Sequence, residues 1–321
     1  MNIQARPPIA RAAYRFCMVA HIALWPSTAP HSHVPSPTLV PAMNSFELAL
    51  KSIEYRRSIL RMIKQANTGH TGGSLSCVDI LNVLYNRTMR VDPSHPNDPQ
   101  RDRYVHSKGH SVEALYAVLA DKGYFPASEL DTLCRAGSHY VGHPTRKVSG
   151  VEQNTGALGH GLPVAVGMAL AAKLDGSAYR VFTTMGDGEL TEGSIWEAAM
   201  AAAHFRLDNL IVIIDRNTLQ ITGRTEDVMS LEPLADRFSA FGFAVRSVAG
   251  NDVAALAEAL DEIPFVAGKP SLLLAHTVKG NGISFMADNA QWHHHVTSED
   301  ELRMALQELQ VAEENLRADH V

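Results

Sequence analysis

Two continuous apolar runs, separated by one helix-length segment, most limit what this chain can fold into. They read "YRVFTTM" (residues 179–185) and "NLIVIID" (residues 209–215), and two further runs, "FAVRSV" and "PSLLLAHTV", follow later in the chain. Uninterrupted apolar runs of this length are typical of strands that are buried on both faces. Helical patterns at residues 194–204 and 253–263 separate them. Strands that alternate with helices predict an α/β fold, with a mostly parallel sheet and helices on both faces.

The rest of the chain adds further helices and one long loop. Apolar residues at three- and four-residue spacing predict helices at residues 46–66, 76–86, 112–122, 162–174 and 298–316. The segment "RDRYVHSKGH" predicts a short strand that runs into a loop. Residues 138–161 are rich in glycine and show little periodicity. A structureless segment of this length inside a compact domain is usually functional.

Composition excludes several classes of protein. The chain has 321 residues, of which 45% are hydrophobic, so it can form a large core. A net charge of -6 and the lack of a basic run argue against a nucleic-acid binder. No stretch approaches the roughly 18 uninterrupted apolar residues of a membrane-spanning helix. The three cysteines, Cys17, Cys77 and Cys134, have no metal-ligand spacing and indicate reduced thiols in a cytoplasmic protein.

Residues 1–42 differ from the remainder of the chain. They contain three arginines, no acidic residue and a cluster of prolines. One interpretation is a targeting peptide, and the other is a disordered extension or translation begun upstream of a true start at Met43. The second is favoured because His21 interrupts the short apolar run and no clean cleavage signal follows. The folded domain is therefore expected at residues 43–321.

Polar residues follow the two strongest strand candidates at their ends. Gly186, Asp187 and Gly188 come directly after the first run, and Asn217 follows the second. Twenty-eight residues separate Gly188 from Asn217, which is enough for one crossover helix and the next strand. Ligands of parallel sheets bind beyond the carboxyl ends of the strands, so these side chains are expected side by side. With the backbone carbonyl of Leu219 they form a three-point oxygen site that suits Mg²⁺ or Ca²⁺.

An oxygen site of this kind indicates that the ligand is a diphosphate. Mg²⁺ completes its coordination shell with phosphate oxygens and water. The N-terminus of the helix expected at residues 194–204 also favours an anion. Gly-Asp-Gly alone is an ordinary turn, but an Asn after the next strand makes the pattern specific.

These residues resemble the signature of thiamine-diphosphate enzymes, Gly-Asp-Gly followed later by Asn, here "GDGELTEGSIWEAAMAAAHFRLDNLIVIIDRN". Four further segments occur in the order and approximate spacing of transketolase: "ANTGHTGGSLS", "VHSKGHSVEALY", "VGHPTR" and "NTGALGHGLPVAVGMA". The resemblance covers about residues 43–296. It implies a thiamine-diphosphate-binding fold whose cofactor is held through Mg²⁺ or Ca²⁺ at Asp187, Asn217 and Leu219.

The resemblance also implies roles for histidines. Those at His70, His110 and His143 match residues that line the channel to the reactive carbon of the cofactor and contact substrate hydroxyls, the diphosphate and the reacting carbonyl. A further active-site histidine maps to His293 in "WHHHV", and the neighbouring His294 is an alternative. Imidazole donates and accepts protons near neutral pH, as a ketol transfer requires. An alternative interpretation of the triple-histidine tract is a fortuitous metal-binding tract.

Four other residues match cofactor contacts of the family. Gly156 and Leu158 match the loop that touches the two rings of thiamine diphosphate. Lys279, in "TVKGNGISF", is expected near the diphosphate, with a solvated loop lysine as the alternative. Glu192 matches a glutamate in a carboxylate network across a subunit interface. An acid in the first turn of a helix also complements the helix dipole without any such role.

Transketolases continue into a second, aminopyrimidine-binding domain, and no residue after Leu316 matches it. That domain supplies a glutamate for the cofactor and arginines for a sugar phosphate. The resemblance therefore predicts the N-terminal subunit of a split transketolase, active in an α2β2 heterotetramer with a separate C-terminal subunit. The expected reaction transfers a two-carbon ketol unit from a ketose, or its phosphate, to an aldose or its phosphate.

Other interpretations stay open. One is the α subunit of a 2-oxoacid dehydrogenase or a deoxyxylulose-phosphate-synthase relative, and another is a non-catalytic cofactor-binding subunit. A nicotinamide-binding domain is excluded because no "GxGxxG" follows a first strand. Thr71 stands in "GHTGG" where relatives commonly read "GHPGG", a departure that would mark a variant substrate class. His160 is assigned no role.

Overall fold

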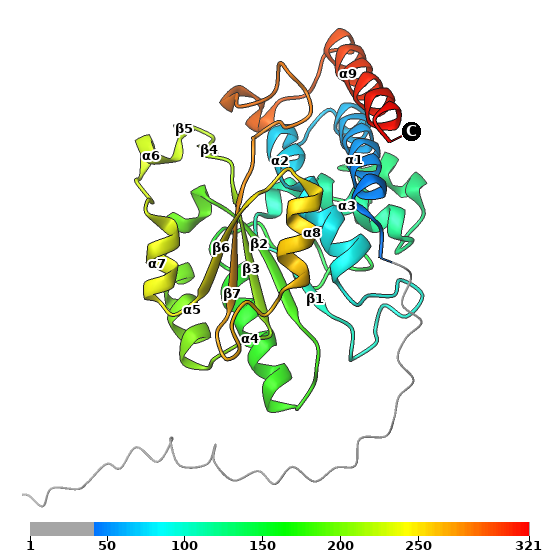
Figure 1. Ribbon diagram of the computed structural model, residues 1–321. Coiled ribbons are helices and arrows are strands. Elements are labelled where there is room, and N and C mark those ends of the chain that lie inside the picture. Colours follow the sequence, from blue (N-terminus) through cyan, green and yellow to red (C-terminus); the bar gives the residue numbers. More distant parts are fainter. Residues whose placement is uncertain (1–41, 321) are drawn as a thin grey trace, which may run out of the picture. The chain divides into compact units, whose positions relative to one another are not determined.

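A five-stranded parallel sheet organises the part of the chain that the computed structural model describes, residues 42–320 (Figure 1). In spatial order the strands are β1 (Arg103–His106), β2 (Val181–Gly186), β3 (Leu210–Arg216), β7 (Ser271–His276) and β6 (Ala244–Ala249). Every neighbouring pair is parallel. The four apolar runs and the short segment before "HSKGH" all form strands, as predicted.

Helices cover both faces of this sheet. One face carries α1 (Ser45–Ala66), α2 (Thr71–Val83), α3 (Val112–Lys122) and α8 (Val253–Asp261). The other carries α4 (Gly161–Leu174), α5 (Gly193–His204) and α7 (Leu234–Ala240). Successive strand residues point to opposite faces, so Ile211 and Ile213 of β3 join the first core, and Val212 and Ile214 join the second. Burial on both sides explains why the strands read as continuous apolar runs.

The C-terminal helix α9 (Glu299–Ala318) packs on α1 through Leu309 and an ion pair between Arg57 and Glu313. Its start is fixed by a capping box between Ser298 and Glu301. None of the helices in the described part of the chain is long and apolar enough to cross a membrane.

Short elements complete the fold. They are the π-helical turn η1 (Leu84–Thr88), the 3-10 helices η2 (Gly109–Ser111), η3 (Ala127–Thr132), η4 (Gly188–Thr191) and η5 (Ala290–His294), the hairpin β4 (Leu219–Gln220) and β5 (Gly223–Arg224), and α6 (Thr225–Val228).

The structure differs from the sequence-based expectations at two places. Helix α2 begins at Thr71 rather than at residue 76, although two glycines in its first turn are poor helix formers. All 13 residues of α2 are buried, so packing overrides propensity. Helix α7 and the β4–β5 hairpin were not predicted.

Of the extension expected at residues 1–42, only Ala42 lies within the described residues. The domain boundary at Met43 therefore stays a prediction. Cys17 also lies outside the described residues. Cys77 and Cys134 are free thiols, one buried and one exposed.

Candidate active site

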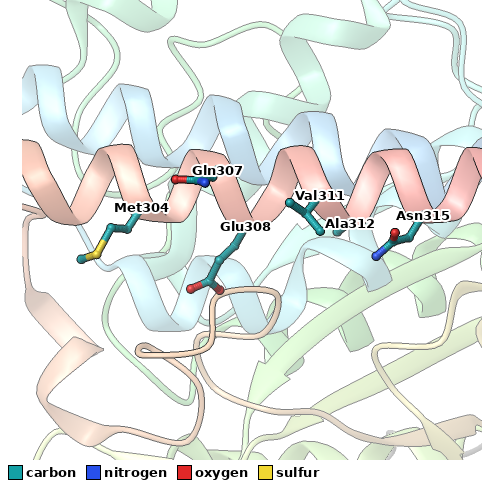
Figure 2. A pocket seen from close by; sticks show the side chains of 6 residues that line it. All are labelled: Met304, Gln307, Glu308, Val311, Ala312 and Asn315. Carbon is teal, nitrogen blue, oxygen red and sulfur yellow. The ribbon is translucent and has the colours of Figure 1, made fainter.

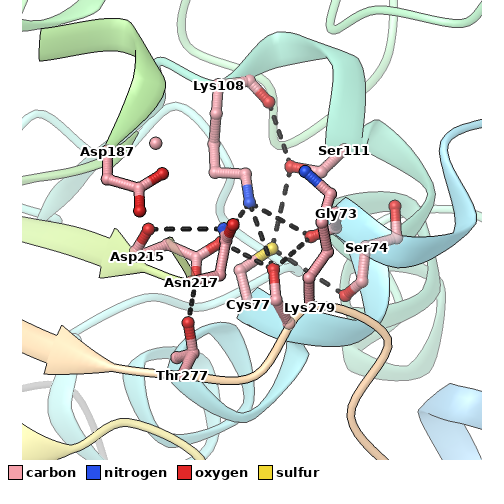
Figure 3. Close-up of polar contacts among 12 residues, drawn as sticks. Gly73, Ser74, Cys77, Lys108, Ser111, Asp187, Asp215, Asn217, Thr277 and Lys279 are labelled. Atoms are coloured by element: carbon pink, nitrogen blue, oxygen red, sulfur yellow. Dashed lines mark hydrogen bonds and ion pairs between the residues drawn. The ribbon is translucent and has the colours of Figure 1, made fainter. Parts of the chain in front are cut away.

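The ends of β2 and β3 bring Asp187 and Asn217 to one edge of the sheet (Figure 3). Gly186 pairs with Asp215 at the carboxyl ends of these parallel strands, and Asp187 and Asn217 follow within two residues. The backbone N–H of Thr218 donates to Oδ2 of Asp187 over 2.6 Å. This bond fixes the loop after β3 against the loop after β2. The two side chains therefore lie in neighbouring loops, where the strand order places them.

The Asp187 carboxylate is almost fully buried, with 1% of the residue exposed. Its Oδ1 accepts the N–H of Gly188 over 2.8 Å, and its Oδ2 also accepts Nη1 of Arg216 over 3.0 Å. Burial raises the pKa of Asp187, the nearby Asp215 raises it further, and Arg216 opposes both. A divalent cation beside Asp187 would stabilise the charged form of this carboxylate.

The oxygen atoms of Asn217 and Leu219 lie in the same loop. Nδ2 of Asn217 donates to Oδ2 of Asp215 over 3.1 Å, and its Oδ1 accepts the N–H of Leu219 over 3.1 Å. The carbonyl of Leu219 accepts Nζ of Lys279 over 2.9 Å. Within residues 42–320 no group of three or more His, Cys, Asp or Glu side chains is arranged to hold a metal ion. A cation here would therefore depend on neutral oxygens together with Asp187, a donor set that fits Mg²⁺ or Ca²⁺.

Two buried lysines place positive charge beside this loop. Lys108 forms an ion pair with Asp215 and donates to the carbonyl of Gly73 over 3.1 Å (Figure 3). Burial alone would lower the pKa of Lys108, but Asp215 raises it above its usual value. Burial and, to a smaller extent, the charge of Lys108 lower the pKa of Lys279 to about 8. No carboxylate of the described chain pairs with Lys279, so its ammonium group suits an anionic ligand such as a diphosphate.

Five histidines from four separate segments form a cluster. The ring centre of His70 lies 5.3 Å from that of His110, 6.3 Å from that of His143, 5.6 Å from that of His293 and 4.7 Å from that of His294. The rings of His110 and His293 are stacked, with centres 5.4 Å apart. The two candidates that the sequence left open, His293 and His294, therefore both lie beside His70.

Four histidines of the cluster have pKa values below the usual range of imidazole. Burial, followed by the charges of neighbouring side chains, lowers the pKa of His70 to about 4 and that of His293 to about 3. The pKa values of His110 and His143 are also lowered, first by burial. Nδ1 of His70 and Nδ1 of His293 are buried and have no hydrogen-bond partner among the described residues. Buried polar atoms are normally paired, so these two nitrogens are suited to a ligand.

A buried glutamate that the sequence analysis did not single out holds His70. Oε1 of Glu113, on α3, accepts the backbone N–H of His70 over 3.1 Å, and Oε2 accepts the hydroxyl of Ser74 over 2.8 Å. A Cβ atom on Gly69 would lie 2.7 Å from Oε1, and the φ of Gly69 is 153°, so glycine is required there. Burial raises the pKa of Glu113 to about 7. In the sequence Glu113 is an ordinary helical acid, and no local signal marks it as buried.

The long loop between α3 and α4 supplies Gly156 and Leu158. Gly156 has a φ of 140°, and a Cβ atom there would lie 2.7 Å from Cδ2 of His143. The glycine therefore allows the backbone to approach the histidine ring. Leu158 is half-buried. His160 is exposed, with Nδ1 3.1 Å from the carbonyl of Leu158, and makes no contact with the cluster that would give it a role.

Glu189, rather than Glu192, is the buried carboxylate after Gly-Asp-Gly. It accepts the N–H of Gly159 over 3.0 Å and the N–H of Gly186 over 3.1 Å, which joins the end of β2 to the long loop. Burial raises the pKa of Glu189. Glu192 is exposed at the N-cap of α5, so its interface role stays a prediction.

A shallow groove on α9 lies elsewhere in the fold (Figure 2). Its lining residues all come from this one helix: Met304, Gln307, Glu308, Val311, Ala312 and Asn315. It contains none of the predicted site residues, so the candidate site is the cluster at the carboxyl edge of the sheet.

The comparisons with known proteins agree with this fold. Residues 50–316 match the family model described as the transketolase thiamine diphosphate binding domain. The match spans most of the chain, and the chain therefore belongs to the transketolase family. The transketolase structure from Leishmania mexicana superposes with a TM-score of 0.76 at 27% identity, over 87% of this chain and 46% of that chain. The chain thus spans less than half the length of this solved transketolase.

Relatives of similar length carry the names of single subunits. One, from Phocaeicola vulgatus, is named for one of the subunits of apulose-4-phosphate transketolase and is 47% identical over 273 residues, 85% of this chain and 97% of that protein. The 6-deoxy-6-sulfo-D-fructose transketolase subunit SqwG of a Clostridium species is 44% identical over 256 residues, 79% of this chain and 93% of that protein. The prediction of a transketolase subunit of the split type is confirmed at this level.

Proposed function

We propose that this chain is the cofactor-binding subunit of a two-chain transketolase, which transfers a two-carbon ketol unit from a ketose or its phosphate to an aldose or its phosphate. One observation carries the proposal: the buried Asp187 and Asn217, a buried lysine without a carboxylate partner and a cluster of histidines adjoin at one edge of the sheet. The carboxylate and amide oxygens suit a cation, the lysine suits a diphosphate, and the histidines suit the hydroxyls of a polyhydroxylated substrate.

Asp187, Asn217 and the carbonyl of Leu219 would hold Mg²⁺, or Ca²⁺ in its place. Lys279 would move from that carbonyl toward the diphosphate of thiamine diphosphate. Further cofactor contacts are expected from His70, His110, Gly156, Leu158, Gly186, Gly188 and Glu192. When bound, thiamine diphosphate supplies the carbon nucleophile and the electron sink for cleavage beside a carbonyl group.

The histidines would hold and move protons on the substrate side. His70, His110, His143 and His293 are neutral near pH 7, so each has one nitrogen that accepts and one that donates a hydrogen bond. One such group can accept the proton of a substrate hydroxyl during carbon–carbon cleavage, and another can return a proton to the acceptor's carbonyl oxygen.

The relatives of similar length are named as single subunits of transketolases, which supports a separate partner chain. We propose a C-terminal transketolase subunit with the aminopyrimidine-binding domain, in an α2β2 heterotetramer. The free thiols Cys77 and Cys134 support a cytoplasmic location.

The names of relatives indicate a class of sugar for this site. The names of the two relatives contain a sugar phosphate in one and a sulfonated sugar in the other. A ketose that bears a terminal anion is therefore the substrate class proposed here.

The test is an assay of ketol transfer from xylulose 5-phosphate to ribose 5-phosphate with thiamine diphosphate and Mg²⁺. The chain is measured alone and mixed with the product of the adjacent gene. Activity in the mixture, and its loss in Asp187→Ala, is the expected result. Strong activity of the chain alone would contradict the two-chain proposal. Failure of metal-dependent cofactor binding in the mixture would overturn the assignment of Asp187 and Asn217.

A further inference from the structure

We infer that the hydroxyl of Thr71 is a positioning group that holds His293 and His294 against His70. The geometric part of this inference is independent of the reaction, and its effect on catalysis rests on the proposed function.

Thr71 is the first residue of α2 and is fully buried. Its Oγ1 donates to the backbone carbonyl of His295 over 2.6 Å, across 224 residues of sequence. Figure 1 shows the orange segment before α9 beside the start of α2. The hydroxyl thus ties the segment that carries the late histidines to the helix that begins directly after His70.

The neighbouring Gly72 fixes the other side of the same histidine pair. A Cβ atom on Gly72 would lie 2.8 Å from the carbonyl oxygen of Trp292, so the backbone of Trp292 rests directly on the first turn of α2. The carbonyl of His295 thus contacts Thr71, and the carbonyl of Trp292 contacts Gly72. His293 and His294 are the two residues between these contacts.

The two contacts have different chemistry. The one at Gly72 is steric and only allows close approach, whereas the one at Thr71 is a directed hydrogen bond. Without that bond the carbonyl of His295 would lose the donor that Thr71 provides, and this end of the segment would be free to shift. A proline at position 71, as in "GHPGG", fits the first position of a helix but has no hydroxyl to donate.

Two other contacts also attach this segment to the fold. Trp292 is 6% exposed and packs on Phe285, with ring centres 5.6 Å apart. Nζ of Lys64 donates to the carbonyl of Thr297 over 2.9 Å. These contacts attach the segment to the fold, so loss of the Thr71 bond is expected to alter the histidine cluster without unfolding the protein.

Three substitutions separate the hydroxyl from the rest of the side chain. Thr71→Val keeps the shape and removes the donor, Thr71→Ser keeps the donor and removes the methyl group, and Thr71→Pro introduces the residue common in relatives. Lys64→Met is the matched control, because it removes a different hydrogen bond to the same segment.

The first measurement is hydrogen–deuterium exchange of the full chain, followed in peptides that cover residues 290–297. Loss of this one hydrogen bond is expected to speed exchange there about fivefold in Thr71→Val and Thr71→Pro. Exchange in Thr71→Ser should stay near the wild-type rate. Wild-type exchange in Thr71→Val would overturn the inference, and so would a Thr71→Ser variant that behaves like Thr71→Val.

The second measurement is the rate at which diethyl pyrocarbonate labels each histidine, resolved by mass spectrometry. The labelling rates of His70, His293 and His294 should change in Thr71→Val and remain as in wild type in Lys64→Met. Faster exchange with unchanged labelling of all three would reduce Thr71 to a structural role and overturn the positioning claim.

Activity of the two-chain enzyme gives the third readout. We expect kcat/KM to fall about fivefold in Thr71→Val and to recover in Thr71→Ser, matching the loss of one hydrogen bond. An inactive wild-type mixture would contradict the proposed function, while exchange and labelling would still decide the role of Thr71.

Discussion

Replacing Glu113 by Gln is expected to make the protein more stable above neutral pH. Glu113 is fully buried and has no cationic partner among its hydrogen-bond donors, the N–H of His70 and the hydroxyl of Ser74. Burial raises the pKa of Glu113 from the ordinary 4.5 to about 7 in the folded state. The folded protein therefore binds this proton more tightly than the unfolded chain does.

The pH window and the magnitude follow from this difference. Both states hold the proton below about pH 4.5, so stability is complete there. As pH rises toward 7 the unfolded chain loses the proton first, and stability falls until the folded state also ionises. At about 1.4 kcal/mol for each unit between the two pKa values, the total loss is roughly 3 kcal/mol. Glutamine avoids this loss and retains both hydrogen bonds, because its oxygen accepts from His70 and its amino group donates to Ser74.

The assay is urea unfolding of the full chain, followed by circular dichroism at pH 5 and pH 8. The free energy of unfolding of Glu113→Gln should gain roughly 2 to 3 kcal/mol over wild type between these two pH values. All other titrating groups are shared, so they cancel in the comparison. Glu258→Gln, at an exposed site on α8, measures the effect of losing one surface charge. A gap between wild type and Glu113→Gln that is the same at both pH values would refute the reasoning.

Three further substitutions test the electrostatics and packing of the site. Asp215→Asn should lower the free energy of unfolding by about 3 to 5 kcal/mol because it leaves Lys108 buried without its carboxylate, and the double variant Asp215→Leu/Lys108→Met should recover most of this in urea unfolding. No recovery would show that the pair has a role beyond its mutual charge. Gly156→Ala forces a Cβ atom against His143 and should lower kcat/KM of the two-chain enzyme by about 10- to 100-fold while the melting temperature shows a folded protein, and a wild-type rate would contradict this packing. Lys279→Met should weaken the binding of inorganic diphosphate about tenfold in calorimetry, and an unchanged affinity would mean that the buried ammonium does not face the anion.

Local pattern was sufficient for the framework of the fold. The apolar runs became β2, β3, β6 and β7, and the helix expected at residues 112–122 is α3. Strands buried on both faces must be apolar throughout, so their sequence shows their position in the sheet. A second rule, that ligands of parallel sheets bind beyond the carboxyl ends of the strands, predicted the site at this edge, and Asp187 and Asn217 do follow adjacent parallel strands.

The histidines show the limit of predicting site residues from local sequence pattern. Motif resemblance indicated His70, His110 and His143, but it left His293 and His294 as alternatives. The structure brings both rings to His70, since the contacts at Thr71 and Gly72 hold the segment on either side of them.

Only the tertiary structure decided which charged and polar residues are buried and with which partner. Glu113 meets the backbone of His70 across 43 residues, Lys108 meets Asp215 across 107, and Thr71 meets His295 across 224. Nothing in the immediate sequence distinguishes these side chains from solvent-exposed ones on a helix or a loop. Their burial depends on which helices cover the sheet, and their pairing depends on which strand ends lie side by side. Apolar periodicity therefore determined the elements, whereas long-range packing determined the electrostatics of the site.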